Sequence, residues 1–472
     1  MKYNLLEEQW LPVLWIGGQV SRLGITETLT QAALIREIAA SNPMDRVAVF
    51  RFLLALLYWC RGNPPATTGA VSGESFPVGW FAKLDTNREC FNLLGDGKRF
   101  YQCREQGDKL HTANYLIHEI PSGTNSNHFR HSIDGVDGLC PACCALGLVR
   151  LPVFSTQGGQ GKSPGINAKP PIYVIPVGET LAETLRLSWR SVSDLGTPAW
   201  EEPNVQLPST GEVPLLTGLT WLPRRVWLEE PRESLSCCIS CGRRDKAIMF
   251  SVFAGKGSAK TDDSTKRVWH DPHVMYRPIK HGEISLHSAD VVGSADAGAG
   301  QWGRTMAGLL ERPRTERSRA WVVGFSSDQN KYLEASEMLL PWPVSPVSPA
   351  FISKLDRWQQ SSYSLTRALR RLDDKPSRKA RIEITTQLAA IRSHVERRVA
   401  ARTEELLSGG DAEWECASSE YIPMMQMIAR SLSPGFTSAA ARRRKQIADM
   451  KPEMGQLQEA RRIPAKVRRS TA

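Results

Sequence analysis

Two short cysteine pairs are the residues of this chain whose types and spacing best fit a metal centre. Cys140 and Cys143 are separated by two residues, and so are Cys238 and Cys241. This spacing lets one turn of backbone present two thiolates to a single metal ion, and four thiolates are a common ligand set for structural Zn²⁺. Because 94 residues lie between the two pairs, a shared ion would join two distant segments of one fold. We therefore predict a structural zinc site formed by these four cysteines.

The same cysteines allow two other interpretations. One is a redox or catalytic role, although catalytic zinc normally has fewer protein ligands and keeps one coordination position open. The other is a set of buried thiols without metal, and Cys144 and Cys237 could also replace one of the four ligands. His270 and His273 could bind a metal as well, but Pro272 interrupts their spacing, so we expect a structural or interface role for them.

Catalytic motifs are missing from the rest of the sequence. Residues 158–163 resemble a phosphate-binding loop, but their glycine spacing differs from that motif and no clear helix follows. The sequence contains no serine elbow, no kinase motif and no acidic cluster typical of a two-metal nuclease. We therefore expect a protein that is not an enzyme.

Length and composition limit the class of protein further. With 472 residues the chain can hold two or three domains with their own cores. It shows no secretion signal, and Arg51 interrupts its most apolar run, residues 47–60, so we expect no membrane span. Ten cysteines in such a chain favour metal binding and reduced thiols over disulfides. We expect a cytoplasmic protein without a membrane partner.

The positive charge of the chain is concentrated at its C-terminal end. Residues 351–472 contain 24 Lys and Arg against 14 Asp and Glu, which accounts for +10 of the net charge of +11. A basic segment attached to a nearly neutral one indicates contact with phosphate. A solvated, arginine-rich helical surface is the alternative.

Hydrophobic periodicity predicts the elements that precede the cysteines. Residues 4–20 alternate apolar and turn residues, which indicates a β-hairpin. Thr26 resembles the start of a capping box, and the helix that it opens is expected to reach about Ala40. Residues 44–58 carry apolar side chains at helical spacing, which indicates a buried helix.

Four polar or glycine-rich segments interrupt the apolar pattern. They are expected to be exposed loops or turns, at residues 125–138, 155–171, 250–266 and 326–330. Such segments offer backbone N–H groups and long side chains that can reach phosphates or base edges. They are the candidates for contact with nucleic acid.

A proline-rich stretch divides the chain into two parts. Residues 341–349 hold four prolines, which neither a helix nor a central strand accommodates. Beyond it, helical spacing predicts a basic four-helix bundle over residues 350–460 and a basic, disordered tail over residues 461–472. The predicted fold class is therefore α+β, with a large mixed α/β N-terminal domain at residues 1–345 that holds the zinc site, followed by the bundle.

The order of its motifs gives the sequence a resemblance to a known family. The motifs are Asn4-Leu5-Leu6, Trp10-Leu11-Pro12-Val13, Phe100-Tyr101-Gln102, the two cysteine pairs, Trp269 with His273, and Gly324-Phe325 leading to Gln329 and Leu333-Glu334. Together they resemble the CasA-type large subunit of the type I-E CRISPR surveillance complex, Cascade. The motifs cover the first 345 residues, and the remainder resembles the family through architecture alone.

The resemblance implies a non-catalytic subunit of a ribonucleoprotein. Such a subunit recognises the protospacer-adjacent motif in double-stranded DNA, mainly from the minor groove, and helps to open the duplex for guide-RNA pairing. The implied partners are the target DNA, the CRISPR guide RNA, the other Cascade subunits and a nuclease-helicase that the subunit helps to recruit.

Carried over by position, the resemblance assigns roles to individual residues. The DNA-binding residues would be the glycine loop Gly158, Gly159, Gln160 and Gly161, the groove lysine Lys256 with Lys260 as its competitor, and the wedge Gln329 with its neighbours Asp328 and Asn330. The loop that docks on the guide RNA and the complex would contain Asn125, Phe129 and His131.

Two alternatives come from other classes of protein. A zinc-dependent nucleic-acid enzyme would need a metal with an open coordination position, and it predicts cleavage by the isolated protein. A basic scaffold without DNA specificity would bind every duplex equally well.

Overall fold

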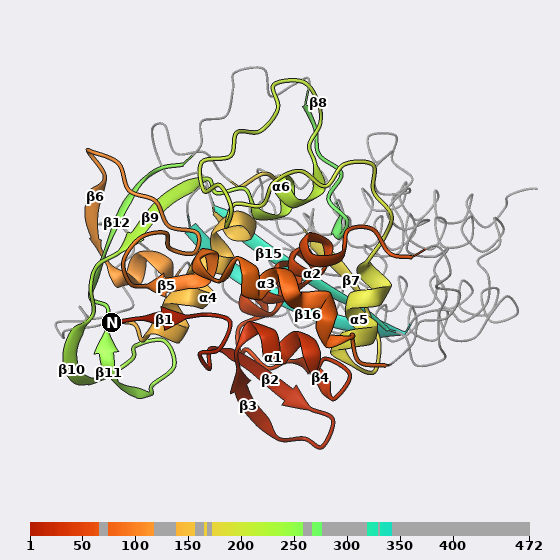
Figure 1. Ribbon diagram of the computed structural model, residues 1–472, viewed down its shortest axis with the longest axis horizontal. Helices are drawn as coiled ribbons and strands as arrows, with labels where there is room; N and C mark the ends of the chain where they lie inside the picture. The colour runs from red at the N-terminus through yellow and green to blue at the C-terminus, as the bar shows by residue number, and fades with distance from the viewer. Residues whose placement is uncertain are drawn as a thin grey trace, which may run out of the picture. The chain divides into compact units, whose positions relative to one another are not determined.

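The described part of this computed structural model is mixed helix and strand, as the predicted fold class requires (Figure 1). The structure describes residues 1–65, 74–117, 138–155, 165–167, 172–257, 267–275, 319–328 and 331–341. The predicted bundle, the tail and the domain boundary near residue 345 lie outside these ranges and stay predictions. The chain divides into two compact units, Met1–Ile284 with Arg312–Leu339, and Ser285–Glu311 with Leu340–Ala472.

A small antiparallel sheet opens the fold. Its central strand is β2 (Leu11–Trp15), which pairs with β3 (Val20–Leu23) on one side and with β4 (Ile35–Ile38) on the other. The turn between β2 and β3 contains Gly18 at φ +85°, a left-handed conformation that favours glycine. A hairpin is therefore present at the start of the chain, but it spans residues 11–23 rather than the predicted residues 4–20.

The helix predicted from Thr26 to about Ala40 is wrong in its length. α1 (Ile25–Thr30) has six residues, and its N-cap is Gly24 without a side-chain cap, so the predicted capping box is not formed. Ile35 and Ile38 are buried by the sheet that β4 forms with β2. Pairing with a neighbouring strand outweighed the weak helix propensity of this stretch.

The helix α2 (Pro43–Arg61) lies at the centre of the first unit, and the prediction of a buried helix is confirmed. Its N-terminus is capped by Asn42, whose Oδ1 accepts a hydrogen bond of 2.8 Å from Met44 N. Every residue from 47 to 59 is buried, because α2 contacts α4 (Pro141–Phe154), α5 (Leu181–Ser188) and α6 (Leu215–Thr220). No helix within the described ranges is long and apolar enough to cross a membrane.

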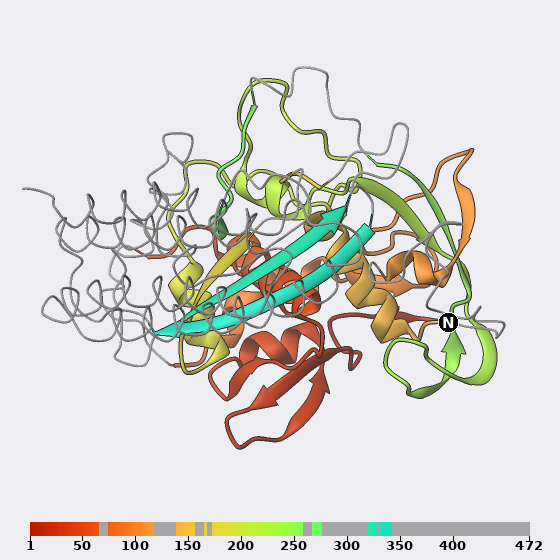
Figure 2. The same cartoon turned by 180° about the vertical axis from the view of Figure 1, so that it is seen from behind.

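The longest strands belong to one antiparallel sheet, in the order β14-β7-β15-β16. Its members are β14 (Val274–Met275), β7 (Ile172–Val177), β15 (Arg319–Asp328) and β16 (Lys331–Pro341). Figure 2 shows β15 and β16 side by side as two long cyan strands. The apolar start of β15, which includes the buried Ala320, Val322 and Val323, continues as strand to Asp328.

A second sheet corrects the first part of the exposed loop predicted at residues 250–266, of which residues 258–266 lie outside the described ranges. Residues 251–256 form β12 (Ser251–Lys256), the middle strand between β6 (Lys109–Thr112) and β9 (Arg224–Leu228). Val252 and Ala254 are buried, so alternate residues of the strand face the core. The small residues of this stretch hide the alternation in the sequence.

The remaining elements of the described ranges are short. They are α3 (Ala82–Thr86), three 3₁₀ turns (Val78–Phe81, Arg88–Phe91 and Ala113–Leu116), and three two-stranded sheets, β1 (Tyr3–Asn4) with β5 (Asn92–Leu94), β10 (Arg232–Cys237) with β11 (Arg244–Ile248), and β8 (Gly211–Glu212) with β13 (Arg267–Val268).

Candidate functional site

The first cysteine pair lies at the beginning of α4. Cys140 is the N-cap, Pro141 occupies the first helical position, and Cys143 lies within the first turn. Proline suits this position, because its missing N–H would have no partner inside the helix. The N-terminus of a helix carries partial positive charge, which would favour the thiolate form of these two cysteines when a metal ion is bound.

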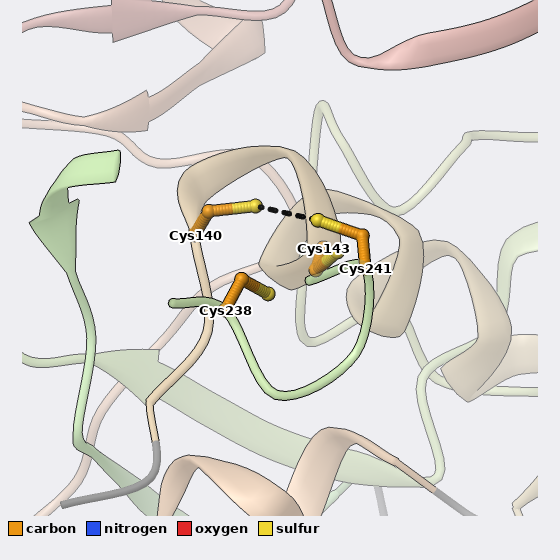
Figure 3. A group of neighbouring side chains, drawn as sticks. All are labelled: Cys140, Cys143, Cys238 and Cys241. Carbon is orange, nitrogen blue, oxygen red and sulfur yellow. Dashed lines mark hydrogen bonds between the residues drawn. The ribbon is translucent and has the colours of Figure 1, made fainter. Parts of the chain in front are cut away.

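The second pair lies in the turn between β10 and β11. Cys238 N donates to Arg243 O, and Gly242 N donates to Cys238 O, both at 2.8 Å. Gly242, which directly follows the second pair, has φ +70°, a left-handed conformation that favours glycine in this tight turn. These two hydrogen bonds close the turn so that Cys238 and Cys241 face the first pair (Figure 3).

Main-chain pairing holds the two turns together. Ile239 N donates to Gly138 O at 3.1 Å, while Leu139 and Met249 exchange two hydrogen bonds of 2.9 Å. A Cβ atom at Gly138 would lie 2.1 Å from Ile248 Cγ2 and 2.8 Å from Met249 O. The residue therefore must be glycine for the segment before α4 to pack this closely on β11.

The four sulfur atoms fit one tetrahedrally coordinated metal ion. All of them lie within 4.8 Å of one another, and the Cys140 and Cys241 sulfurs are 3.8 Å apart. A regular tetrahedron of sulfurs about 2.3 Å from a zinc ion has edges of about 3.8 Å. Figure 3 shows the sulfurs of both pairs converging from α4 and from the β10–β11 turn. The predicted grouping of these cysteines is therefore confirmed as a possible metal centre.

The two neighbouring cysteines are not members of this group. Cys144 is buried in the core, and burial raises the pKa of its thiol well above the usual value. Cys237 is exposed. Neither residue is needed to complete a set of four ligands.

Hydrogen bonds among the four thiols divide their protons unevenly. The pKa of Cys238 is lowered by its hydrogen bonds with Cys140 and Cys143. The pKa of Cys241 is lowered to about 5, mainly by its hydrogen bond with Cys143. Cys143 lowers the pKa of Cys140, but the hydrogen bond to Cys238 and burial outweigh this and raise it to about 12. The hydrogen bonds of Cys143 raise its own pKa. The second pair therefore offers thiolates to a cation near neutral pH.

Arg22 of β3 is a part of this site that the sequence reasoning missed. Its guanidinium interacts with the Cys241 thiol and contributes to the low pKa of that thiol. Four thiolates around a divalent ion leave an excess of negative charge, which a neighbouring guanidinium offsets. No local signal marks Arg22, because it lies in the N-terminal hairpin, far from the cysteines in sequence.

Lys256 is the predicted DNA-binding residue whose side chain the structure describes. It is the exposed last residue of β12, opposite Arg224 of β9. At the next position, a Cβ atom on Gly257 would lie 2.3 Å from Pro223 C and 2.4 Å from Arg224 N. The backbone behind Lys256 is therefore packed against the start of β9, which gives this lysine a fixed base.

The other predicted nucleic-acid-binding residues are not brought together by the described ranges. Asp328 is the last residue of β15. Outside the described residues lie Gly158, Gly159, Gln160, Gly161, Lys260, Gln329, Asn330, Asn125, Phe129 and His131.

The two histidines near Trp269 do not share a site. His270 is exposed, and its Nε2 lies 3.6 Å from Glu212 Oε1. His273 is fully buried, with its Nε2 3.0 Å from Ser188 Oγ. The structural role expected for this segment is confirmed for His273.

The chain is similar to known proteins of one family. A family model described as CRISPR-associated protein Cse1 matches residues 4–411. The CRISPR-associated protein CasA/Cse1 of Thermus thermophilus is 25% identical over 415 residues, which are 79% of this chain and 77% of the relative.

Solved structures show the same fold. The crystal structure of Thermobifida fusca Cse1 has a TM-score of 0.70 at 17% identity, and the match covers 97% of this chain and 98% of that one. A chain of a CRISPR RNA-guided surveillance complex has a TM-score of 0.68 at 14% identity, with 97% and 99% covered. Both matches extend over nearly the whole length of the chain.

Proposed function

Because the chain belongs to the CRISPR-associated Cse1 family, we propose that it is the large, non-catalytic subunit of a type I-E Cascade complex. In this function it recognises the protospacer-adjacent motif in double-stranded DNA and promotes strand opening for the guide RNA. The observation that carries the proposal is the family match across residues 4–411. The fold likeness to a chain of an RNA-guided surveillance complex supports guide RNA and other Cascade subunits as partners.

The proposed DNA contacts come from three segments. The glycine loop (Gly158, Gly159, Gln160 and Gly161) offers backbone N–H groups to the base edges in the minor groove. This groove is narrow, so the backbone must approach closely. Lys256 adds a cation from the end of β12, in preference to Lys260, because its exposed side chain has a fixed base. Gln329, between Asp328 and Asn330, acts as a wedge between base pairs.

The remaining contacts concern the other partners. We assign the loop with Asn125, Phe129 and His131 to the guide RNA and the complex. The basic residues beyond 350 form the proposed four-helix bundle, whose charge suits the RNA–DNA hybrid, the displaced strand or the incoming nuclease-helicase.

The cysteine cluster supports a structural zinc ion rather than a catalytic one. Four cysteine ligands fill a tetrahedral coordination sphere, which leaves no position for a water molecule or a substrate. When bound there, zinc would join the start of α4 to the β10–β11 turn. This argues against the zinc-dependent enzyme among the alternatives.

Binding of the reconstituted complex to two duplexes that differ only in the motif tests the proposal. With this subunit present, the duplex with the preferred motif should bind more tightly, and Lys256→Ala should reduce its affinity about tenfold, as for a lost charged contact. Lys246→Ala is the matched control. It removes an exposed lysine from a different strand, β11, and should leave the affinity unchanged.

Each alternative predicts a different outcome. Equal gains in affinity for both duplexes would identify a basic scaffold. Cleavage of either duplex by the isolated protein would identify an enzyme.

A further inference from the structure

A buried ion pair ties α2 to the segments that flank the proposed DNA-binding loops. Arg51 Nη1 and Nη2 donate to Asp271 Oδ1 and Oδ2, each at 2.7 Å. The two side chains are 3% and 0% exposed. Buried charges are tolerated when they are paired and fully hydrogen-bonded, and two parallel bonds also fix the orientation of both partners.

The Asp271 carboxylate accepts two further hydrogen bonds. Asn167 Nδ2 donates to Oδ2 at 3.1 Å, and His273 N donates to Oδ1 at 2.9 Å. Each oxygen therefore has two donors. The ring of His273 extends the network to Ser188 Oγ, at the end of α5.

Asn167 connects this network to the base of the proposed glycine loop. It lies in the described segment 165–167, which follows the loop in sequence. Gly165 N donates to Ser155 O at 2.8 Å, so the residues on both sides of the loop meet. The bond from Asn167 to Asp271 then fixes this base against α2.

The same network reaches the strand that leads to the proposed wedge. Val174 N donates to His273 O at 2.8 Å, which joins the network to β7. β7 pairs with β15, whose last residue, Asp328, precedes Gln329.

A second contact holds the β15–β16 hairpin to α2. The Arg46 guanidinium lies 5.3 Å from the centre of the Trp321 ring and 2.5 Å from the Glu337 carboxylate. α2 is therefore a common frame for the base of the glycine loop and for the hairpin.

We propose that Arg51, Asp271 and Asn167 form a positioning clamp that sets the base of the glycine loop relative to the wedge hairpin. The inference rests on the proposed function, because it assigns the clamp to motif discrimination. To read a short motif, the glycine loop and the wedge must contact the same steps of the DNA. If the protein segments that carry them are fixed before binding, the entropic cost of binding is lower. Loss of the Asn167 bond should therefore weaken motif reading more than binding to other DNA.

Asn167→Leu is the sharpest test, because it removes the amide that ties the loop and leaves the Arg51–Asp271 pair in place. In the reconstituted complex, affinity for the motif duplex should fall about tenfold, as expected for a lost hydrogen bond to a charged group. Affinity for a duplex without the motif should not change. Asn167→Ser, whose side chain is too short to reach Asp271, should behave in the same way if the leucine variant fails to assemble.

Gln102→Met provides the matched control. Gln102 is a similarly buried amide, 4% exposed against 7% for Asn167. Its side chain donates to Leu93 O and accepts from Leu228 N, and it makes no bond to the described segments that flank the glycine loop or the wedge. It should lower the melting temperature without changing the ratio of the two affinities. An unchanged ratio in both Asn167 variants, or an equal change in the Gln102 variant, would overturn the clamp.

The Lys256→Ala result distinguishes failure of the clamp from failure of the proposed function. If Lys256→Ala lowers the affinity ratio and the Asn167 variants do not, the clamp is wrong and the proposed function stands. If removal of the whole subunit leaves the ratio unchanged, the proposed function itself fails.

Discussion

At the residue scale, the cysteine cluster depends on four sulfurs that two separate main-chain turns hold within 4.8 Å of one another. Each turn is closed by its own local bonds, and the turns meet through the pairing of Leu139 with Met249. A metal ion at this point would crosslink the two segments in addition to those hydrogen bonds. Because the unfolded chain has no preformed site, the free energy of metal binding would add to the free energy of folding.

Replacing one ligand should therefore remove the metal and destabilise the first unit. We expect Cys140→Ser or Cys238→Ser to lose bound zinc and to melt at a lower temperature than the wild type. Metal analysis by mass spectrometry and thermal unfolding would measure the two effects. Cys237→Ser is the control, because this thiol is exposed and lies outside the cluster. Full zinc content and unchanged melting in the Cys140 variant would contradict the metal centre.

Asp271 predicts a pH dependence of stability. Burial alone would raise the pKa of its carboxyl group, but the charge and the hydrogen bonds of Arg51 lower it below the usual value. A lowered folded-state pKa gives stability that is present above the ordinary value of about 3.9 and is lost as the pH falls through the folded-state pKa.

The variant Asp271→Asn cannot ionise, so its deficit relative to the wild type should be largest near neutral pH. It should shrink as the pH falls below about 4. Urea unfolding of both proteins at several pH values would measure the difference. A deficit that stays constant into acid would show that the carboxylate charge contributes nothing.

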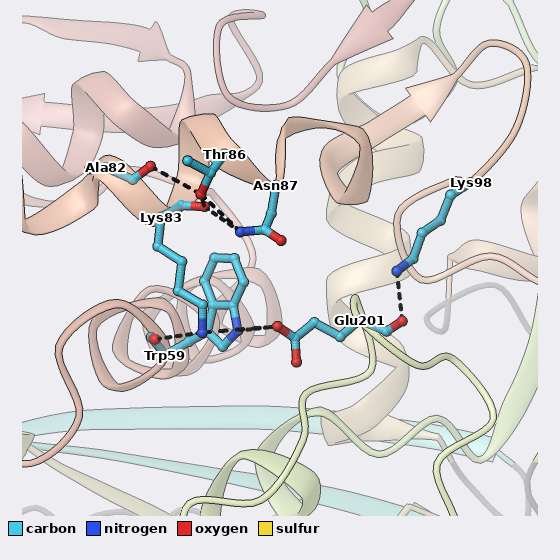
Figure 4. Close-up of polar contacts among 7 residues, drawn as sticks. All are labelled: Trp59, Ala82, Lys83, Thr86, Asn87, Lys98 and Glu201. Atoms are coloured by element: carbon cyan, nitrogen blue, oxygen red, sulfur yellow. Dashed lines mark hydrogen bonds and ion pairs between the residues drawn. The ribbon is translucent and has the colours of Figure 1, made fainter.

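At the element scale, α2 connects the parts of the first unit. Its C-terminal end is held by Trp59 Nε1, which donates to Glu201 Oε1 at 2.8 Å, and by Lys83 Nζ, which donates to Trp59 O at 3.2 Å (Figure 4). The Lys83 ammonium also lies 4.2 Å from the centre of the Trp59 ring, a favourable cation–π distance. These contacts fix the orientation of α2 against α3.

The helix α4 links the cysteine cluster at its start to the base of the glycine loop at its end. It has 14 residues, and it is fixed to α2 by the buried pair of Arg150 and Asp45, in which Arg150 Nη2 donates to Asp45 Oδ2 at 2.7 Å. The side chains are only 6% and 9% exposed. Removing one partner would leave an uncompensated buried charge.

Arg150→Met should therefore lower the free energy of unfolding by about 3–5 kcal/mol. The double variant Arg150→Met with Asp45→Leu should recover much of this loss, because it removes both charges. Urea unfolding would compare the three proteins. Arg88→Met breaks the exposed pair with Glu7 and should change stability little. A double variant no more stable than Arg150→Met would refute this account.

At the scale of the whole molecule, charge is separated from the candidate recognition residues. The first 350 residues carry a net charge of only +1, while the remainder carries +10. Contacts with phosphates add affinity for any sequence and are weakened by salt. The basic part should therefore strengthen binding without selecting the motif.

Changing the basic run 442–445 to glutamine tests this division. Affinity of the complex for duplexes with and without the motif should fall by the same factor, and the salt dependence of both should become weaker. Binding at three salt concentrations would measure both quantities. A change in the ratio of the two affinities would place motif recognition in the C-terminal part.

Much of the local structure followed from the sequence alone. The spacing within each cysteine pair and the apolar run of α2 are short-range signals, and each predicted a feature of the fold. The order of motifs also indicated the family that the match across residues 4–411 shows. The turns and the helix were predictable because their signals lie within a few residues of the structure that they specify, whereas the family followed from the order of motifs along the chain.

Tertiary structure decided the features that depend on residues far apart in the chain. Residues 35–38 became a strand because β2 lies beside them, and residues 251–256 became a strand between β6 and β9. Arg51 stands out in an apolar run, which signals a buried partner, but the sequence does not show that Asp271 pairs with it. The approach of Arg22 to Cys241 had no signal at all. Local propensities are weak, and burial and pairing energies arise only when distant segments meet.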